Sequence, residues 1–360
     1  MSSTFEAGRF GSGHAVHRIE DAALLAGQGR YTDDVPAAGE TVLAFLRSPY
    51  AHARIVSIDA AAARALPGVL AVYTGAELAA AGVKPIPSID VFKRADGSAL
   101  ATPPRRALAH ERVRFVGEAV AAVVAESRDA ARDACEAIVV DYEELPSVND
   151  AASAVRPGAV AICSEAPDNI AAEMRHGDAA ATRLAFERAV HVVSLDLVNQ
   201  RLAPSSIEPR SVLAETDPAS GRLTVRLSSQ MPTAVMNGLV DAIPGLAAGQ
   251  VRVVVGDVGG GFGMKTGIYP EDIAVAWAAR TLGRPVRWQA DRSEELVSAV
   301  HGRDVLSRAE MALDADGRVL ALRIRSLANV GAYATATGVV IQLLIGPWVT
   351  TSIYDIGTVD

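Results

Sequence analysis

Four glycines lie within five positions of one short stretch, Gly259-Gly260-Gly261-Phe262-Gly263, and Met264 and Lys265 follow them. Glycine has no β-carbon, so this stretch can bring backbone N–H groups close to a bound group or adopt positive φ angles repeatedly. Either property costs conformational entropy on folding, which indicates a structural or chemical purpose. The first chemistry to test is a phosphate cradle made of main-chain donors.

A phosphate cradle fits the order of the elements but not the residues. The stretch follows an apolar run at residues 251–255, which is typical of a buried strand, and precedes a helical pattern that starts near Pro270. A P-loop requires glycine where Met264 stands and a helix that starts at Lys265. Met264 also occupies the third glycine position of the dinucleotide motif. Phosphate binding is therefore a minor alternative, and a glycine-rich bulge that serves only packing explains the glycines on their own.

The elements before this stretch form two similar units, each with the order strand, strand, helix, strand. We expect strands at residues 41–46, 53–58, 69–73, 113–116, 119–125 and 139–142, a helix from Asp59 to Leu66 and a helix from Ser127 to about residue 138. The shared pattern predicts one compact α+β domain at residues 20–145. An extended lead-in at 1–19 precedes it, and a linker rich in alanine and proline follows at 146–167.

The second part, residues 168–360, mixes strands and helices around the glycine stretch. We expect strands at residues 190–195, 212–214, 223–227, 251–255, 285–289 and 321–328, helices at 233–242 and 270–282, and a hairpin with an Asp-Gly turn at 313–319. The glycines therefore connect a strand to a helix. Their neighbours in space must come from distant parts of the sequence.

Composition excludes several classes of protein. The 360 residues are enough for two domains, and the net charge of −8 is spread along the chain, which argues against nucleic acid as a partner. The N-terminus lacks signal-peptide features, and the apolar segment 338–349 is too short to span a membrane, so we expect a cytoplasmic protein without a membrane partner. Cys135 and Cys163 have no metal-binding spacing, and Cys135 lies in a helical pattern typical of buried packing.

The seven histidines have no spacing typical of metal ligands, and we expect them to be structural or surface residues. They are His14, His17, His52, His110, His176, His191 and His301.

Several motifs, in order along the chain, resemble the large, molybdenum-binding subunit of the xanthine dehydrogenase/aldehyde oxidase family, and most closely its aerobic carbon monoxide dehydrogenase branch. They are Arg18-Ile19-Glu20-Asp21 with residues 24–34, Ser48-Pro49-Tyr50-Ala51-His52-Ala53, Val116-Gly117-Glu118-Ala119-Val120-Ala121, Ile207-Glu208-Pro209-Arg210, Ser229-Gln230, the glycine stretch, and the segments 269–271, 283–288 and 291–295. The resemblance implies an α/β hammerhead domain followed by an incomplete mixed α+β molybdenum-cofactor-binding domain.

The resemblance also implies site residues, a cofactor and partners. Gln230 would lie near the molybdenum oxo group, and the backbone of Gly260, Gly261, Phe262 and Gly263 would wrap the ligands of the metal, with Phe262 shielding it from water. No residue here would bind the metal directly. The cofactor would be molybdenum-molybdopterin, in its cytosine dinucleotide form. FAD and 2Fe-2S clusters would sit on a medium and a small partner subunit.

Arg210 and Lys265 are further candidates, although a solvated strand end and a loop lysine are the favoured explanations. Thr266 stands where purine-oxidising members have a glutamate, which argues against a purine substrate.

The family's large chain is much longer, and its second half carries the arginine-rich active-site loop and the glutamate general base. No general base is assigned here, so we expect the chain alone to be inactive and a second polypeptide to supply the rest. The alternative is a non-catalytic scaffold or remnant that exposes an apolar patch at residues 339–345.

Overall fold

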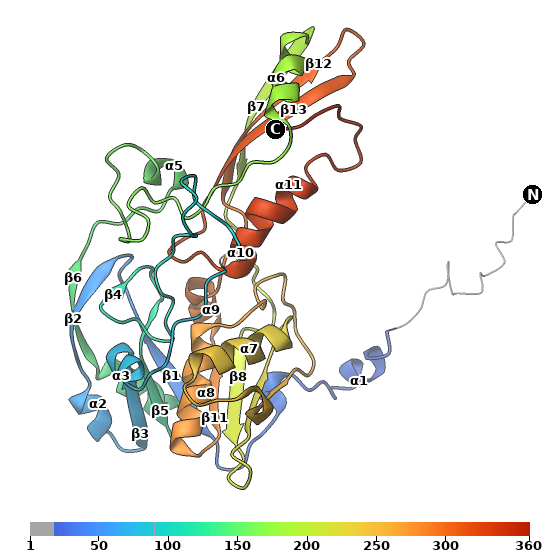
Figure 1. The fold of residues 1–360 in the computed structure, drawn as a ribbon. Helices are drawn as coiled ribbons and strands as arrows, with labels where there is room; N and C mark the ends of the chain where they lie inside the picture. Colours follow the sequence, from blue (N-terminus) through green and yellow to red (C-terminus); the bar gives the residue numbers. More distant parts are fainter. Residues whose placement is uncertain (1–17, 90) are drawn as a thin grey trace, which may run out of the picture.

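The computed structural model describes residues 18–89 and 91–360, so the predicted lead-in at 1–19 lies outside the described residues except for its last two. The described chain has a main body, in which helices pack on a large sheet, and an arm that extends from one end of that body (Figure 1). The glycine stretch belongs to the main body.

Seven strands form the main sheet in the order β10-β9-β8-β11-β1-β5-β3. They are β10 (Val251–Val254), β9 (Leu223–Leu227), β8 (Ser211–Thr216), β11 (Val286–Gln289), β1 (Thr41–Arg47), β5 (Ala119–Ala125) and β3 (Val69–Thr74). The pairs β1/β11 and β10/β9 are parallel, and the other neighbours are antiparallel. Strands from the two predicted parts of the chain therefore share one sheet, joined where β1 pairs with β11.

A smaller sheet has the order β4-β2-β6, with β4 (Arg112–Val113), β2 (Ala53–Asp59) and β6 (Val139–Glu144). The two predicted units of the first part therefore interleave, because strands of one unit pair with strands of the other. The strand expected at 113–116 ends at Val113. The chain turns there, since Glu118 N–H donates to Phe115 O over 3.2 Å and Gly117 has a φ of +99°.

The helices flank these sheets; one begins at the predicted cap Ser127, whereas the helix expected from Asp59 begins at Ala61 with Ala60 as its N-cap residue. They are α1 (Asp21–Leu25), η1 (Thr32–Asp34), α2 (Ala61–Ala65), α3 (Gly75–Ala80), α4 (Arg128–Glu136), α5 (Ala151–Ala154), α6 (Ala179–Glu187), α7 (Pro232–Ala242), η2 (Ala248–Gln250), α8 (Pro270–Leu282), α9 (Arg292–Ser298), α10 (Ala336–Val340), η3 (Ile341–Ile345) and α11 (Gly346–Trp348). Ser127 caps α4 by accepting the N–H of Ala130. Gly283 ends α8 with a left-handed φ of +64°.

The strand β5 is buried on both faces, which explains its continuous apolar sequence. Its residue Val124 belongs to the largest core cluster, together with Val212 of β8, Trp288 of β11 and Ile273 of α8. The adjacent Val123 belongs to a separate cluster under α2 and α4. The largest core therefore contains residues from both parts of the chain.

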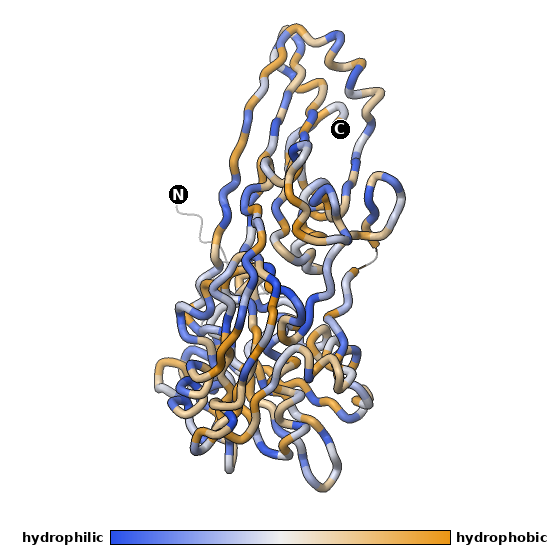
Figure 2. Tube along the Cα trace, turned by 90° about the vertical axis from the view of Figure 1, so that its left-hand side faces the viewer, coloured by the Kyte–Doolittle hydropathy of each residue, from blue (hydrophilic) through white to orange (hydrophobic). Residues whose placement is uncertain are grey.

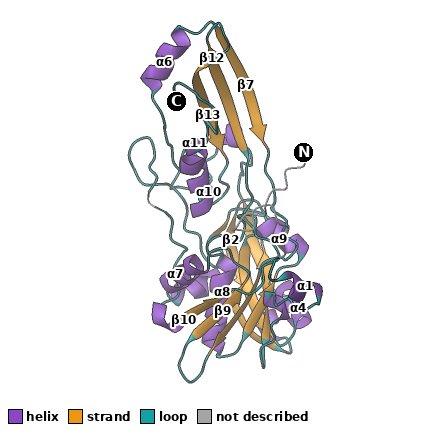
Figure 3. Cartoon of the chain, turned by 90° about the vertical axis from the view of Figure 1, so that its right-hand side faces the viewer, coloured by secondary structure: helices purple, strands orange, loops and turns teal. Residues whose placement is uncertain are grey.

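The arm is a three-stranded antiparallel sheet in the order β13-β12-β7, with β7 (His191–Asn199), β12 (Val305–Leu313) and β13 (Val319–Ala328) (Figure 3). The predicted hairpin with an Asp-Gly turn joins β12 to β13, and Gly317 has a φ of +80° there. The helix α6 packs against β13 through a small cluster around Ala185.

The late apolar stretch 339–345 is only partly exposed, in contrast to the predicted patch. Val339 packs in a small cluster with Phe92 and Leu100, whereas Ile341 and Ile345 are exposed. Helical folding causes this difference, because α10 and η3 turn alternate apolar side chains inward. None of the described helices has the length and apolar character needed to cross a membrane.

Candidate functional site

The glycine stretch forms the loop between β10 and α8, and three of its residues have left-handed backbone angles. The φ angles are +105° at Gly260, +50° at Phe262 and +84° at Gly263. Met264 N–H donates to Gly261 O over 2.8 Å, which closes a tight turn. The side chain of Phe262 is 75% exposed. The positive φ angles that the glycines predict are present, and one of them falls on a bulky residue type that rarely adopts it.

Gln230 lies between β9 and α7 and contacts the loop directly. Its side-chain Oε1 accepts the N–H of Gly263 over 3.0 Å, and its own main-chain N–H donates to Lys265 O over 2.9 Å. A β-carbon on Gly261 would lie 2.6 Å from Cδ and Oε1 of Gln230, which is too close for a real contact. The structure therefore brings together Gln230 and residues 260–263, the set singled out from the sequence, and glycine at 261 permits the approach.

Lys265 is fully buried directly beneath the loop, so it is not a loop lysine in solvent. Its Nζ donates to Glu208 Oε2 over 2.9 Å, to Glu208 O over 2.8 Å and to Ser228 Oγ over 2.8 Å. Burial lowers the pKa of Lys265, and the hydrogen bond to Glu208 opposes that shift. The ammonium group therefore has its three donors satisfied by partners on two distant segments.

Glu208 and Ser228 are residues whose roles the sequence did not reveal. Glu208 Oε2 also accepts the N–H of Gly259 over 2.7 Å and the hydroxyl of Ser228 over 2.6 Å. A β-carbon on Gly259 would lie 2.4 Å from the Cβ of Glu208. The carboxylate therefore anchors the start of the loop, and the first glycine is needed for close packing.

Arg210 is likewise buried, in contrast to a solvated strand end. Its guanidinium donates to Glu295 Oε2 over 2.9 Å and to Glu271 Oε2 over 3.1 Å, and it lies 4.0 Å from the ring centroid of Tyr269. Burial opposes the charge, but the two carboxylates and Tyr269 raise the pKa of Arg210 above its ordinary value. Arg210 therefore fixes the relative positions of α8, α9 and the segment that carries Glu208.

The same network reaches the first part of the chain through Arg47 of β1. Arg47 Nη2 donates to Glu271 Oε1 over 3.0 Å and contacts Glu294 Oε1 at 2.7 Å. Burial alone would raise the pKa of Glu271, but Arg210 and Arg47 lower it to about 2. At the adjacent position, burial raises the pKa of Asp272 to about 7, and the charge of Glu271 adds to that shift.

The surface of the loop carries donors that lack acceptors. Among the described residues, the N–H groups of Gly260, Gly261 and Phe262 and the side-chain amide nitrogen of Gln230 donate no hydrogen bond. Consecutive N–H groups in a loop with left-handed residues form a concave site for anions. The arrangement can therefore bind a group that is negatively charged or rich in acceptors.

The loop itself offers no free base or nucleophile. The carboxylate nearest to it, Glu208, is held by Lys265, and no group of three or more potential metal ligands occurs within the described ranges. His52, which the sequence predicts to be a fold residue, is buried, with Nδ1 2.8 Å from Pro146 O. The buried thiol of Cys135 has its pKa raised by burial to about 12, consistent with its predicted packing role.

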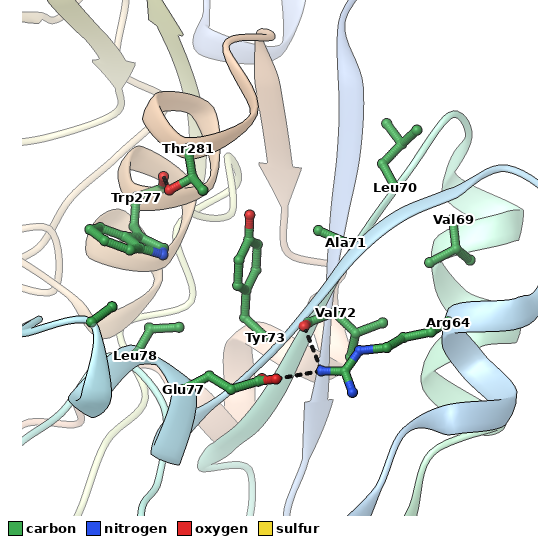
Figure 4. A pocket seen from close by; sticks show the side chains of 11 residues that line it. Arg64, Val69, Leu70, Ala71, Val72, Tyr73, Glu77, Leu78, Trp277 and Thr281 are labelled. Carbon is green, nitrogen blue, oxygen red and sulfur yellow. Dashed lines mark hydrogen bonds and ion pairs between the residues drawn. The ribbon is translucent and has the colours of Figure 1, made fainter.

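An open groove of about 480 Å³ lies elsewhere, beside the edge strand β3 (Figure 4). Tyr73, Leu78 and Trp277 line it. Arg64 and Glu77 at its rim form an ion pair of 2.6 Å, so their charges largely satisfy each other. The groove is separate from the glycine loop and shares no residue with it.

This architecture defines a class of protein: a mixed α+β chain in which a glycine loop of main-chain donors rests on buried ion pairs. Two protein-family models match the chain. The aldehyde oxidase and xanthine dehydrogenase a/b hammerhead domain matches residues 26–146, and the molybdopterin cofactor-binding domain matches residues 162–360. The chain therefore belongs to the molybdopterin-binding subunits of the aldehyde oxidase and xanthine dehydrogenase family, as the sequence motifs predicted.

Individual relatives support this family assignment. The chain is 35% identical to the nicotine 6-hydroxylase large subunit of Paenarthrobacter nicotinovorans, over 97% of this chain and 41% of the relative. It is 37% identical to the carbon monoxide dehydrogenase large chain of Afipia carboxidovorans, over 90% and 40%. Quinoline 2-oxidoreductase from Pseudomonas putida 86 has a similar structure, with a TM-score of 0.83 and 35% identity over 96% of this chain and 43% of that chain. The chain thus spans about two fifths of the length of these relatives.

The residues present fit a molybdopterin group. Such a group is bulky and anionic, and the loop offers the N–H groups of Gly260, Gly261 and Phe262, which donate to none of the described residues, beside the Gln230 amide. The glycines also leave this surface without side-chain bulk, since a β-carbon on Gly263 would meet nothing within 4 Å. The open surface at these glycines is better explained by the close approach of a large anion than by tight packing inside the protein.

Proposed function

We propose that this chain is the N-terminal portion of the large subunit of a molybdenum hydroxylase. One observation supports the proposal in a chain of this family. The N–H groups of Gly260, Gly261 and Phe262 and the Gln230 side-chain amide nitrogen donate no hydrogen bond to a described residue. When bound, the molybdenum cofactor would supply oxidative hydroxylation of a small molecule, or oxidation of carbon monoxide, with water as the source of oxygen.

The residues of this chain would bind and orient that group. The N–H groups of Gly260 and Gly261 would hold its acceptor atoms, and the Gln230 amide nitrogen would donate to a neighbouring oxygen. Phe262, exposed in this chain, would cover the bound group and exclude water. Glu208 and Lys265 would keep the loop in its bound geometry, because they fix both of its ends.

Further parts of the proposal concern the cofactor, the partners and the substrate. The cofactor would be the cytosine dinucleotide form, and electrons would leave through 2Fe-2S clusters and FAD on small and medium subunits in the cytoplasm. The Thr266 hydroxyl donates to Gly263 O over 2.7 Å, and this neutral contact at the position of the purine-binding glutamate favours a substrate other than a purine. We also propose the domain division predicted from the sequence, at 20–145, 146–167 and 168–360.

The test is to produce the chain together with the polypeptide that the following stretch of its genome encodes, and to measure molybdenum in the purified complex by elemental analysis. We expect stoichiometric metal in the complex and no turnover by the chain alone. A complex without molybdenum would favour the alternative, a non-catalytic scaffold of the same fold.

Two variants sharpen this test. Gln230→Ala should reduce molybdenum retention by roughly 10- to 100-fold, the usual effect of removing a residue that supports a metal group. The matched control is Gln28→Ala, at an exposed position outside the loop. Equal retention in both variants would count against the role of Gln230.

A further inference from the structure

The strand β7 is unusual because it is long, apolar and exposed along its whole length. All nine of its residues are exposed. The exposed fractions are 56% for Val193, 58% for Leu195 and 46% for Leu197. A long, flat, apolar edge strand is a template for pairing with another chain, and proteins normally shorten, charge or cover such edges.

The register of the arm shows which face of β7 these residues share. Side chains alternate between the faces of a sheet, so Val193, Leu195 and Leu197 lie on one face. Their cross-strand partners in β12 are Met311, Ala309 and Ser307, and Met311 and Ala309 stand opposite Leu322 and Ile324 of β13. This surface, which we call the apolar arm face, carries no charged side chain among these positions. The charged residues Asp196, Arg308 and Arg325 lie on the opposite face.

The helix of the arm packs on the opposite face, over β12 and β13. Ala185 of α6 packs against Ala312 and Ala321, and Phe186 of α6 lies under Arg323. These partners alternate with the residues of the apolar arm face, so they point the other way. Figures 1 and 3 show the arm extending away from the main body, and Figure 2 shows hydrophobic residues along its strands. No described part of the main body therefore covers β7.

The main-chain groups of β7 are also open on one side. Beyond the strand, Leu202 and Gly302 exchange both N–H···O bonds, of 3.1 and 2.9 Å, in the register that β7 and β12 keep. Because bonded and non-bonded pairs alternate in antiparallel sheets, the even-numbered residues of β7 bond to β12. The N–H and C=O groups of Val193, Leu195 and Leu197 therefore point to the open edge. The other edge of the arm sheet, at β13, is partly paired, because the N–H groups of Leu322 and Ile324 donate to Thr358 O and Asp360 O.

We infer that β7 and the apolar arm face dock a β-strand with apolar side chains from the remaining three fifths of a molybdenum hydroxylase large subunit. The inference rests on the proposed function. One fact favours this occupant over a second copy: the relatives are 35–37% identical to this chain, yet the chain covers only 40–41% of their length. Such a strand would extend the arm sheet by main-chain hydrogen bonds and bury its apolar face.

Amide hydrogen exchange tests this inference on the full chain, alone and produced with the polypeptide that its genome encodes next. In the chain alone, the amides of Val193, Leu195 and Leu197 should exchange rapidly. In the complex they should exchange at least about tenfold more slowly, because the added strand accepts their hydrogen bonds. Unchanged exchange at these amides in a complex that has formed would overturn the inference, and so would their protection in a dimer of the chain alone.

A pair of variants separates docking from folding. Leu195→Lys places a charge on the apolar arm face and should abolish co-purification of the second polypeptide, whereas Ser194→Lys, on the opposite face beside Glu310, should leave it intact. Both side chains are exposed, so both variants should keep the unfolding midpoint of the parent. Equal co-purification of the two variants would overturn the inference. A complex with protected β7 amides but no molybdenum would support docking and contradict only the proposed function.

Discussion

Individual residues of the site act through buried charges rather than through exposed ones. Lys265 has no exposed side-chain surface, and its partner Glu208 is largely buried. A buried ion pair adds little net stability when intact, but loss of one partner leaves an uncompensated charge. The loop geometry therefore depends on a residue that the sequence alone could assign only to a loop.

Lys265→Met should destabilise the chain by roughly 3 kcal/mol, the lower end of the usual cost of breaking a buried pair, because Glu208 retains some contact with water. Urea unfolding measures this change. The matched control is Lys84→Met at an exposed position, which should change the free energy of unfolding by less than about 0.5 kcal/mol. Similar values for the two variants would show that the Glu208 pair has no structural role.

Replacing different glycines of the loop with alanine should reduce the stability of the chain by different amounts. Gly259→Ala would place a β-carbon 2.4 Å from Glu208 Cβ, so the segments must separate, and we expect a loss of about 1–3 kcal/mol, as for other overpacked sites. Gly263→Ala meets no atom within 4 Å, and only its left-handed angle opposes it, at about 1–2 kcal/mol.

Thermal unfolding and the near-ultraviolet spectrum of the two glycine variants provide the measurement. Gly259→Ala should shift the midpoint more than Gly263→Ala. The reverse order would mean that backbone strain, and not the contact with Glu208, sets the requirement for glycine.

At the scale of elements, the ends of helix α8 could be predicted from the sequence, but the burial of its acidic residues could not. Pro270 at its first turn, acidic residues after it and Gly283 beyond its end are local signals, and the predicted range 270–282 is confirmed. The burial of Glu271 and Asp272 is not local. It results from Arg210 and Arg47, which are distant in sequence and reach α8 only through the fold.

The same distinction explains what could be predicted of the site. Gln230 and residues 260–263 could be singled out because they belong to short motifs, and their cofactor-binding role stays a prediction. The strands could be predicted because their apolar patterns are local. Glu208 and Glu295 were missed because a carboxylate in a polar stretch gives no sign that it will be buried beside a cation. The pairing of β1 with β11 was missed for a similar reason, since strand order depends on contacts between distant segments.

The carboxyl group of Asp272 makes stability depend on pH. In the folded chain its pKa is raised to about 7, whereas in an unfolded chain it is about 4, so the native state binds more protons between these values. This contribution therefore favours the folded state at low pH and is lost as the pH rises from about 4 to about 7. Asp272→Asn removes it and keeps an oxygen that can accept the Tyr269 N–H, now bonded over 2.8 Å.

We expect the stability of Asp272→Asn relative to the parent chain to increase between pH 4 and pH 7 and to stay constant above about pH 8. Urea unfolding at a series of pH values measures the difference. Comparing the two chains at each pH cancels the opposite contribution of Glu271, whose pKa of about 2 favours the folded state above pH 4. A difference that is independent of pH would mean that Asp272 is ionised throughout in the folded chain.

At the scale of the whole molecule, the segments matched by the two family models form one structural body. The main sheet joins them at β1 and β11, and Arg287 of β11 donates to Glu40 Oε2 over 2.9 Å and to Thr32 O over 3.1 Å. Arg47 of β1 makes the reciprocal link to Glu271 of α8. The hammerhead segment therefore helps to position the helix that follows the glycine loop.

This junction predicts that the main body unfolds as a single cooperative unit, and Trp288 is the residue that tests it. The indole is almost fully buried in β11 and meets Phe45 of β1 edge to face, with ring centroids 5.5 Å apart. Trp288→Ala should lower the free energy of unfolding by roughly 3–5 kcal/mol. Native-state hydrogen exchange should show the same decrease for amides of β5 and of β9, which lie on opposite sides of the junction.

The control variant Val139→Ala, at an exposed position, should leave the free energy of unfolding and the exchange of these amides unchanged. A decrease confined to β9 would instead establish two independently folding domains, and the hammerhead segment would then have no direct effect on the stability of the loop.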